Sequence, residues 1–140
     1  MSKATYDDVN LILRLYEIRR EEKLRAARVW FVTNFKVKTV AEMSALAAPG
    51  SEANAYFRQS TSYWDMVAGF ITAGVLDQEL FFESGRELLL FWLRLKPIAA
   101  EYRQVTKSTK AWSNMETVAN AFAEHMGREA FDAFAARVAG

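Results

Sequence analysis

The sequence predicts an all-α fold, and three observations support this prediction. Apolar residues recur at spacings of three and four along most of the chain, which is the period of an amphipathic helix. Alternating β-branched runs bounded by turn dipeptides, the usual signal of strands, are scarce. The connections between the helical segments are short. We therefore expect a compact antiparallel bundle of about five to eight helical segments, folded as a single domain over residues 1–140.

The first two helical segments follow from capping and periodicity. We expect a helix from Thr5 to about Arg20, because Asp7 and Asp8 fall in its first turn, where acids complement the helix dipole. Its apolar residues share one face: Val9, Ile12, Leu13 and Tyr16. A second segment, from Glu21 to about Phe35, has its own stripe: Leu24, Ala27, Phe31 and Phe35. The pattern leaves open whether the two segments are continuous.

Capping residues mark the next two helices. Thr39 and Glu42 have the spacing of a capping box, and a Pro-Gly pair at residues 49–50 stops the short helix that follows. Ser51 is expected to cap a longer helix, and Gly74 lies where a left-handed residue would end it. The predicted face of this longer helix consists of Tyr56, Ser60, Tyr63, Val67, Phe70 and Ile71.

The second half of the chain contains the predicted centre of the bundle. Asp77 is expected to cap a short turn of helix over residues 78–83. The segment from 85 to 103 is apolar almost all round, so we place it centrally, with a kink expected at Pro97. A further helix is expected from about Thr109 to Gly127. The last helix carries Phe131, Phe134, Ala135 and Val138.

The composition excludes several classes of site. The chain has no cysteine, so it cannot form disulfides or thiolate metal sites. The single histidine, His125, lies near a predicted helix end, and we expect it to have a capping or surface role. One histidine cannot supply both Glu-x-x-His motifs of a di-iron bundle. Ser51 and Ser113 lie beside helix starts and are expected to be caps. No nucleophile elbow or glycine-rich nucleotide loop is present. The sequence therefore favours a non-enzymatic protein and gives no reason to expect a cofactor.

Charge and hydropathy give expectations about location. The formal net charge is +1, which supplies no global field to attract a polyanion. No apolar stretch approaches the roughly 20 residues of a membrane span. The N-terminal residues lack the apolar segment of a secretory signal, because Asp7 and Asp8 follow too soon. We expect a cytoplasmic protein.

Three polar residues are candidates for a small-ligand site. Arg103, Glu116 and Asp65 each adjoin strongly apolar stretches. A buried carboxylate without a partner is costly, so an internal acid should be paired with an arginine or neutralised. Arg103 and Glu116 would then either form part of a ligand pocket or join two helices as a structural ion pair. We favour the structural ion pair.

A basic region offers a different function. Residues 14–38 contain eight Lys or Arg against three Asp or Glu. An anion-binding face in this region would bind RNA or single-stranded nucleic acid through phosphate contacts. Its candidate residues are Arg19, Arg20, Lys23, Arg25 and Arg28. However, Glu21 and Arg25 form a favourable i,i+4 pair, so an ordinary solvated face explains the pattern better.

The high number of aromatic residues supports our leading hypothesis for function, which is protein interaction. The chain has ten Phe, five Tyr and four Trp. These residues fill the core, but exposed aromatic side chains are also typical anchors of protein interfaces. Because no catalytic motif accompanies them, we expect a non-enzymatic protein-interaction or regulatory module that binds a protein partner or forms a homo-oligomer.

Two stretches of the chain carry a family resemblance. One contains Leu15–Arg20 and then Ala26–Trp30. The other begins at Gly74-Val75-Leu76-Asp77 and continues through Trp92, Pro97-Ile98, Tyr102-Arg103, Trp112 and Glu116. Together they resemble a bacterial helical family, domain of unknown function 4760. The resemblance implies an all-helical fold of uncharacterised function and supplies no catalytic residue.

Overall fold

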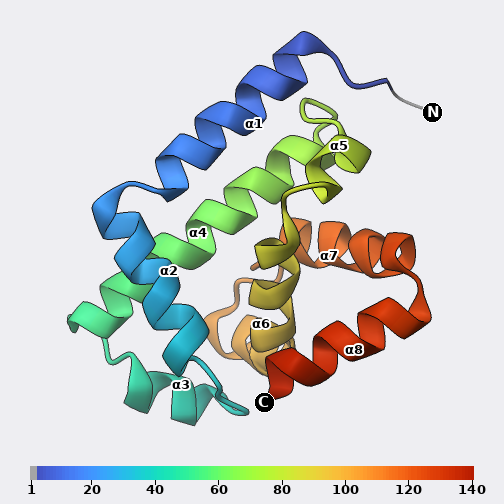
Figure 1. Cartoon of the computed structure of the whole chain (residues 1–140). Coiled ribbons are helices and arrows are strands. Elements are labelled where there is room, and N and C mark those ends of the chain that lie inside the picture. Colours follow the sequence, from blue (N-terminus) through green and yellow to red (C-terminus); the bar gives the residue numbers. More distant parts are fainter. Residues whose placement is uncertain (1–2) are drawn as a thin grey trace.

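The computed structural model describes residues 3–140, and this part of the chain forms eight helices and no strand (Figure 1). The predicted all-α fold is thus confirmed. In chain order the helices are α1 (Tyr6–Arg19), α2 (Glu22–Asn34), α3 (Val40–Leu46), α4 (Glu52–Thr72), α5 (Gln78–Phe82), α6 (Arg86–Thr106), α7 (Ser113–Met126) and α8 (Arg128–Ala139).

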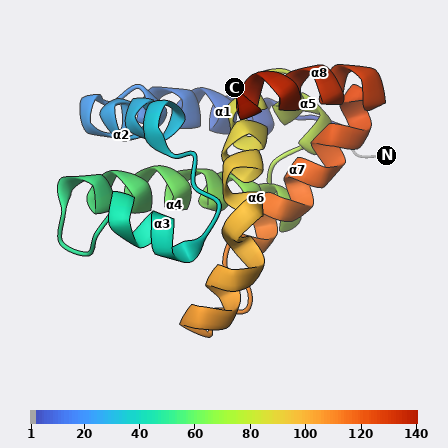
Figure 2. The ribbon, with the colours of Figure 1, turned by 90° about the horizontal axis from the view of Figure 1, so that it is seen from below.

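The helices pack in layers around α6. Figure 2 shows α1 and α2 in one layer and α3 and α4 in a second, while α6 crosses beside both. Helices α2 and α7 both pack on α4, and α8 packs on α6 and α7. The predicted central position of the segment near residues 85–103 is confirmed. Its buried residues in α6 are Leu88, Leu89, Phe91, Trp92, Leu95, Ile98 and Ala99.

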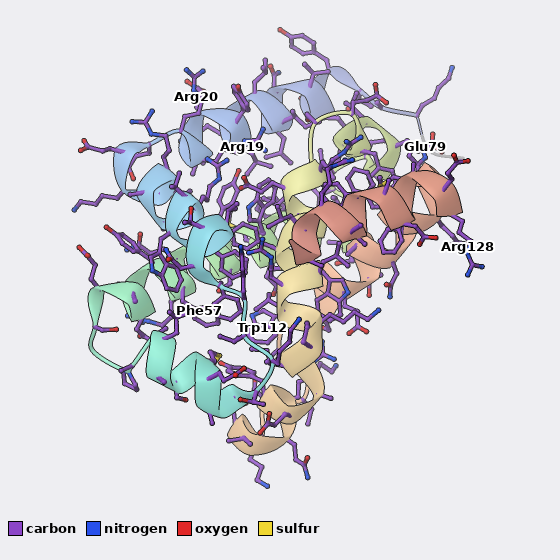
Figure 3. The ribbon with its side chains drawn as sticks, turned by 60° about the horizontal axis from the view of Figure 1, so that its bottom comes forward. Arg19, Arg20, Phe57, Glu79, Trp112 and Arg128 are labelled. Atoms are coloured by element: carbon purple, nitrogen blue, oxygen red, sulfur yellow. The ribbon has the colours of Figure 1, made fainter. Side chains whose placement is uncertain are left out.

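Stacked aromatic rings form the centre of the core. The ring of Phe31 in α2 stacks on Phe91 in α6, with centroids 3.9 Å apart, and on Phe35, at 4.7 Å. Phe35 in turn stacks on Phe57 of α4 at 5.2 Å. Figure 3 labels Phe57 at one end of this stack. Because each large ring removes much apolar surface from water, this stack ties α2, α4 and α6 together.

The N-caps predicted at Thr39, Ser51 and Asp77 are confirmed, and Thr5, the expected start of the first helix, is a cap as well. The side chains of Thr5, Thr39, Ser51 and Asp77 each accept a hydrogen bond from the backbone N–H three residues later. The carboxylate of Glu21 accepts from two backbone N–H groups at the start of α2. The chain therefore turns between α1 and α2 rather than continuing as one helix.

Two local predictions need correction. Most of the predicted apolar face of the first helix points outward, because Val9, Leu13 and Tyr16 are exposed while Asp8 and Leu15 are buried. Ile12 alone of that face is partly buried and packs against the core. Ser113 is not a cap, because it lies inside α7. The cap position belongs to Trp112, which has a left-handed backbone (φ 58°) and whose side chain makes no capping hydrogen bond.

No helix within residues 3–140 has both the length and the apolar character needed to span a membrane.

Candidate functional site

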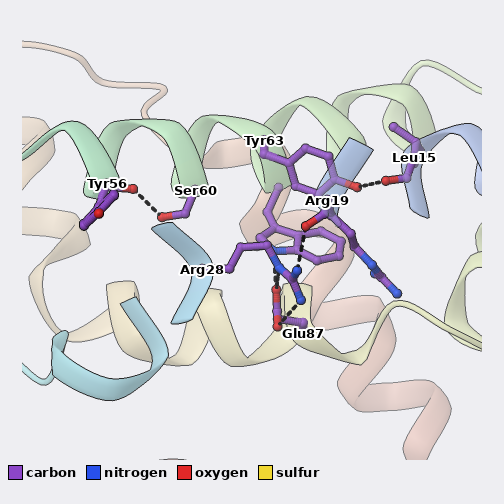
Figure 4. A network of polar contacts seen from close by, with 8 residues as sticks. Leu15, Arg19, Arg28, Tyr56, Ser60, Tyr63 and Glu87 are labelled. Atoms are coloured by element: carbon purple, nitrogen blue, oxygen red, sulfur yellow. Dashed lines mark hydrogen bonds and ion pairs between the residues drawn. The ribbon is translucent and has the colours of Figure 1, made fainter. Parts of the chain in front are cut away.

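A cluster of polar contacts, which we call the Glu87 network, joins four helices (Figure 4). The guanidinium of Arg28 donates to both carboxylate oxygens of Glu87, with Nη2 and Oε1 2.9 Å apart. The indole Nε1 of Trp64 donates to the same carboxylate at 3.0 Å. Arg28 also donates through Nη1 to the backbone oxygen of Arg19 at 2.8 Å. Residues from α2, α4 and α6 thus meet at one carboxylate, and Arg28 joins α1 to them through the Arg19 backbone oxygen.

Electrostatics in this network favour a structural role. Burial lowers the pKa of Arg28, but the hydrogen bonds and negative charge of Glu87 outweigh that effect and leave the pKa above its ordinary value. Beside the network, the Tyr63 hydroxyl donates to the backbone oxygen of Leu15 at 2.7 Å, and burial raises the pKa of Tyr63 to about 12. Both groups of the ion pair are engaged, so they hold helices together rather than offering a free acid or base.

Helix α1 is anchored at both of its ends. At its C-terminal end, Tyr63 and Arg28 hold the backbone oxygens of Leu15 and Arg19. At its N-terminal end, one oxygen of the Asp8 carboxylate accepts from the Asp77 N–H at 2.8 Å, and the other accepts from Thr5. Hydrogen bonds from the Thr5 and Asp77 N–H groups hold the pKa of Asp8 below its ordinary value. The orientation of α1 on the bundle is therefore fixed.

The outer face of α1 carries large apolar side chains that face solvent. We define the α1 stripe as Tyr6, Val9, Leu13 and Tyr16. Their exposed fractions are 79%, 41%, 55% and 44%. The guanidinium groups of Arg19 and Arg20 lie over the Tyr16 ring, 4.7 and 5.3 Å from its centroid, but all four side chains of the stripe remain exposed. Contiguous apolar surface of this kind marks interaction sites more often than isolated exposed side chains do.

Arg103 and Glu116 lie together, as a pair between α6 and α7. Arg103 Nη2 is 2.9 Å from Glu116 Oε1, and Arg103 Nε donates to the backbone oxygen of Ala111 at 2.8 Å. The guanidinium also lies over the ring of Trp92, 5.8 Å from its centroid. The pair thereby fixes the loop between the two helices.

Asp65 lies nearby on α4 but performs a different task. Its Oδ1 accepts from the backbone N–H of Met115 at 3.1 Å, in the first turn of α7. Asp65 thus replaces the capping bond that Trp112 cannot make. Burial raises the pKa of Asp65, although the Met115 N–H and the charge of Arg103 act in the opposite direction.

A surface hollow of about 440 Å³, which we call the Asp65 hollow, lies beside this carboxylate. It is lined by Asp65 but by neither Arg103 nor Glu116. The structure thus brings the three predicted residues into one region and leaves one of them facing the hollow.

The five basic candidates do not form one exposed face. Arg28 lies against Glu87, and the guanidinium of Arg19 lies over the rings of Tyr16 and Trp64, at 4.7 and 5.5 Å from their centroids. Arg20 projects outward beside Tyr16 (Figure 3). Lys23 and Arg25 are exposed on α2. The cluster in the sequence is thus divided between the interior and the surface.

Other polar residues have structural positions. The guanidinium of Arg94 donates to three backbone oxygens, those of Val32, Phe35 and Val138, and burial lowers its pKa. His125 is exposed, with its ring 4.9 Å from that of Phe82. Within residues 3–140 no group of three or more His, Asp or Glu side chains is placed to hold a metal ion.

Sequence reasoning missed Glu87 and Trp64 as members of the Glu87 network, and Tyr63 as the hydrogen-bond donor beside it. One local signal was available: Glu87 lies in the first turn of α6, where an acid complements the helix dipole. Its partners lie 23 and 59 residues away along the chain, beyond the reach of any local pattern.

Comparison with known proteins gives a family and no individual relative. The chain matches no curated protein and no solved structure. The model of a domain of unknown function, DUF4760, matches residues 4–122, which include α1 to α6 and most of α7. The expected family is confirmed, and the chain belongs to the DUF4760 family.

Proposed function

We propose that the protein is a non-enzymatic interaction or regulatory module that forms a homodimer through the α1 stripe. The exposure of this stripe on an anchored helix is the observation that carries the proposal. A helix whose orientation is already fixed loses little conformational freedom when a partner binds, so more of its contact energy remains available as affinity.

The spacing of the stripe suits a second helix. Its members follow one another at intervals of three, four and three residues, which is the a and d pattern of a coiled-coil seam. In an antiparallel pair related by a two-fold axis, Tyr6 of one copy faces Tyr16 of the other. Val9 then faces Leu13. The same four side chains therefore complement themselves when the second helix runs in the opposite direction.

The proposed interface is short. A helix of 14 residues is about 21 Å long, and a seam of that length is small beside a standard interface of about 800 Å² per partner. We therefore expect a dimer that dissociates on dilution through the micromolar range.

Sedimentation equilibrium from about 1 to 100 μM tests this proposal. We expect the mass of the wild-type protein to rise from that of the 15.9 kDa monomer toward twice that value. Leu13→Asp places a charge in the seam and should leave a monomer throughout. Val105→Asp is the matched control, because Val105 is 61% exposed outside the stripe, and it should dimerise like the wild type.

Circular dichroism of each variant checks that the fold is intact. A wild-type protein that stays monomeric at every concentration, or a folded Leu13→Asp variant that dimerises normally, overturns the proposal.

A further inference from the structure

The Asp65 hollow has an aromatic wall and a polar floor. The wall consists of Tyr102 of α6 and Trp112, whose rings stack with centroids 4.4 Å apart. Phe57 meets Trp112 edge-on at 6.2 Å. The backbone at Trp112 is left-handed, with φ at 58°, which is unusual for a bulky residue. The hollow's volume of about 440 Å³ falls within the common range of small-molecule sites.

The floor of the hollow offers hydrogen-bond acceptors. Thr61 and Ser62, on the turn of α4 before Asp65, both line it. The Thr61 hydroxyl donates its proton to the backbone oxygen of Phe57 at 2.7 Å, and the Ser62 hydroxyl donates to that of Arg58 at 2.6 Å. Because each hydroxyl has one proton, which is already donated, each oxygen can serve a ligand only as an acceptor.

The negative charge of Asp65 is incompletely matched. Its carboxylate accepts one backbone hydrogen bond, from Met115, and forms no ion pair within residues 3–140. A half-buried carboxylate with a single N–H partner is less stable than one facing a cation. The raised pKa of Asp65 agrees with this incomplete matching.

The nearest arginines are engaged elsewhere. The guanidinium of Arg103 is held by Glu116 and by the backbone oxygen of Ala111. Arg58 lines the hollow, but its Nε donates to Asn54, one turn further from Asp65. Neither side chain therefore fills the place of a counter-ion at the Asp65 carboxylate.

We propose that the Asp65 hollow binds a primary ammonium group attached to an apolar body. The ammonium would donate to the Asp65 carboxylate and to the lone pairs of Thr61 and Ser62. The apolar body would lie along Tyr102, whose ring also attracts a nearby cation. This inference does not depend on the α1 stripe, which lies on another helix.

Two kinds of molecule carry such an ammonium group: a free amine and a lysine side chain of another protein. Isothermal titration calorimetry with phenethylamine as its ammonium ion and with Nα-acetyl-lysine amide tests both. The neutral 2-phenylethanol controls for the charge. We expect saturable binding of at least one ammonium probe, and the tighter one identifies the source.

Asp65→Asn is the informative variant, because the asparagine oxygen can still accept from the Met115 N–H while the charge is removed. We expect ammonium binding to weaken by about tenfold or more. Asp132→Asn is the matched control at an exposed carboxylate, and its binding should equal that of the wild type. Absence of saturable binding, equal binding by folded Asp65→Asn, or equally tight binding of 2-phenylethanol overturns the proposal.

Discussion

At the scale of single residues, the interior is arranged so that each polar group has a partner. Every buried side-chain nitrogen or oxygen in the described part of the chain makes a hydrogen bond. The Glu87 carboxylate accepts hydrogen bonds from both Arg28 and Trp64. The Tyr63 hydroxyl donates to a backbone oxygen of α1. Since an unsatisfied buried group would cost about 1–3 kcal/mol, these contacts specify how the helices dock.

The buried phenol of Tyr63 gives a prediction about alkaline unfolding. Its pKa rises from 10.0 to about 12 in the folded protein. Its contribution to stability is therefore complete below pH 10, where both states hold the proton. It is lost as the pH rises toward 12, because the unfolded chain ionises first. We expect this residue to lower the free energy of unfolding by at most about 1.4 kcal/mol per pH unit in that window.

Urea unfolding of the wild type and of Tyr63→Phe between about pH 9 and 12 measures this effect. The phenylalanine variant loses the hydrogen bond to Leu15 but cannot ionise at this position. The wild-type curve should therefore fall more steeply with pH. Parallel loss of stability in the two proteins would contradict the prediction.

At the scale of helices, most N-caps come from residues nearby in the sequence, and one comes from a residue distant in the chain. Thr5, Thr39 and Ser51 cap their helices through bonds to residues three positions away, so their role is readable from the sequence. Helix α7 is different, because Trp112 supplies no side-chain bond and Asp65 reaches its first turn from 50 residues away. The capping role of Asp65 cannot be read from the sequence, because it depends on the packing of α4 against α7.

Two glycines should respond to alanine in opposite directions. At Gly85, which precedes α6, an added Cβ would lie 2.1 Å from the ring of Phe81, which is buried and cannot swing into solvent. At Gly69, inside α4, the nearest atom would be 3.5 Å away, an ordinary contact. Gly85→Ala should therefore cost about 1–3 kcal/mol. Gly69→Ala should stabilise the protein by up to about 1 kcal/mol, because alanine is the better helix former.

Chemical denaturation of both variants at neutral pH provides the measurement, with each serving as the control for the other. Changes of the same sign at the two positions would show that the packing around Gly85 or Gly69 differs from that described.

At the scale of the whole molecule, Arg94 connects elements from both halves of the chain. From α6 it donates to backbone oxygens of Val32 and Phe35 near the end of α2, and to that of Val138 near the end of α8. A guanidinium suits this position because helix C-termini present unpaired carbonyls and partial negative charge. Helix α8 lies beyond the residues matched by the family model, and Arg94 holds its end to the family core.

Replacing Arg94 should loosen α2 and α8 together. We expect Arg94→Met to lower the free energy of unfolding by about 1.5–3 kcal/mol, the range for hydrogen bonds to a charged group. Lys96→Met on the same helix removes an exposed cation and should change stability by about 0.5 kcal/mol or less. Hydrogen exchange should accelerate at the C-terminal ends of α2 and α8 in the Arg94 variant alone. An Arg94→Met protein as stable and as protected as Lys96→Met would refute this assignment.

The sequence by itself determined the helices, most of their caps and the central place of α6. These properties depend on spacings of a few residues, and Leu88, Leu95 and Ile98 are buried as that periodicity predicts. Tertiary structure decided which face of α1 is covered. Apolar residues lie on both faces of that helix. Packing against the bundle buries Leu15, while Leu13 and Tyr16 stay exposed.

Tertiary structure also decided the polar partners. Arg28 looked like its basic neighbours in the sequence, but packing placed it against Glu87, 59 residues away. Asp65, Arg103 and Glu116 were marked by their apolar surroundings, yet only packing separated the ion pair from the carboxylate that lines the hollow. Periodicity shows that a helix has a face to bury, whereas the surface it meets depends on helices distant in the chain, because side-chain contacts act over a few ångströms.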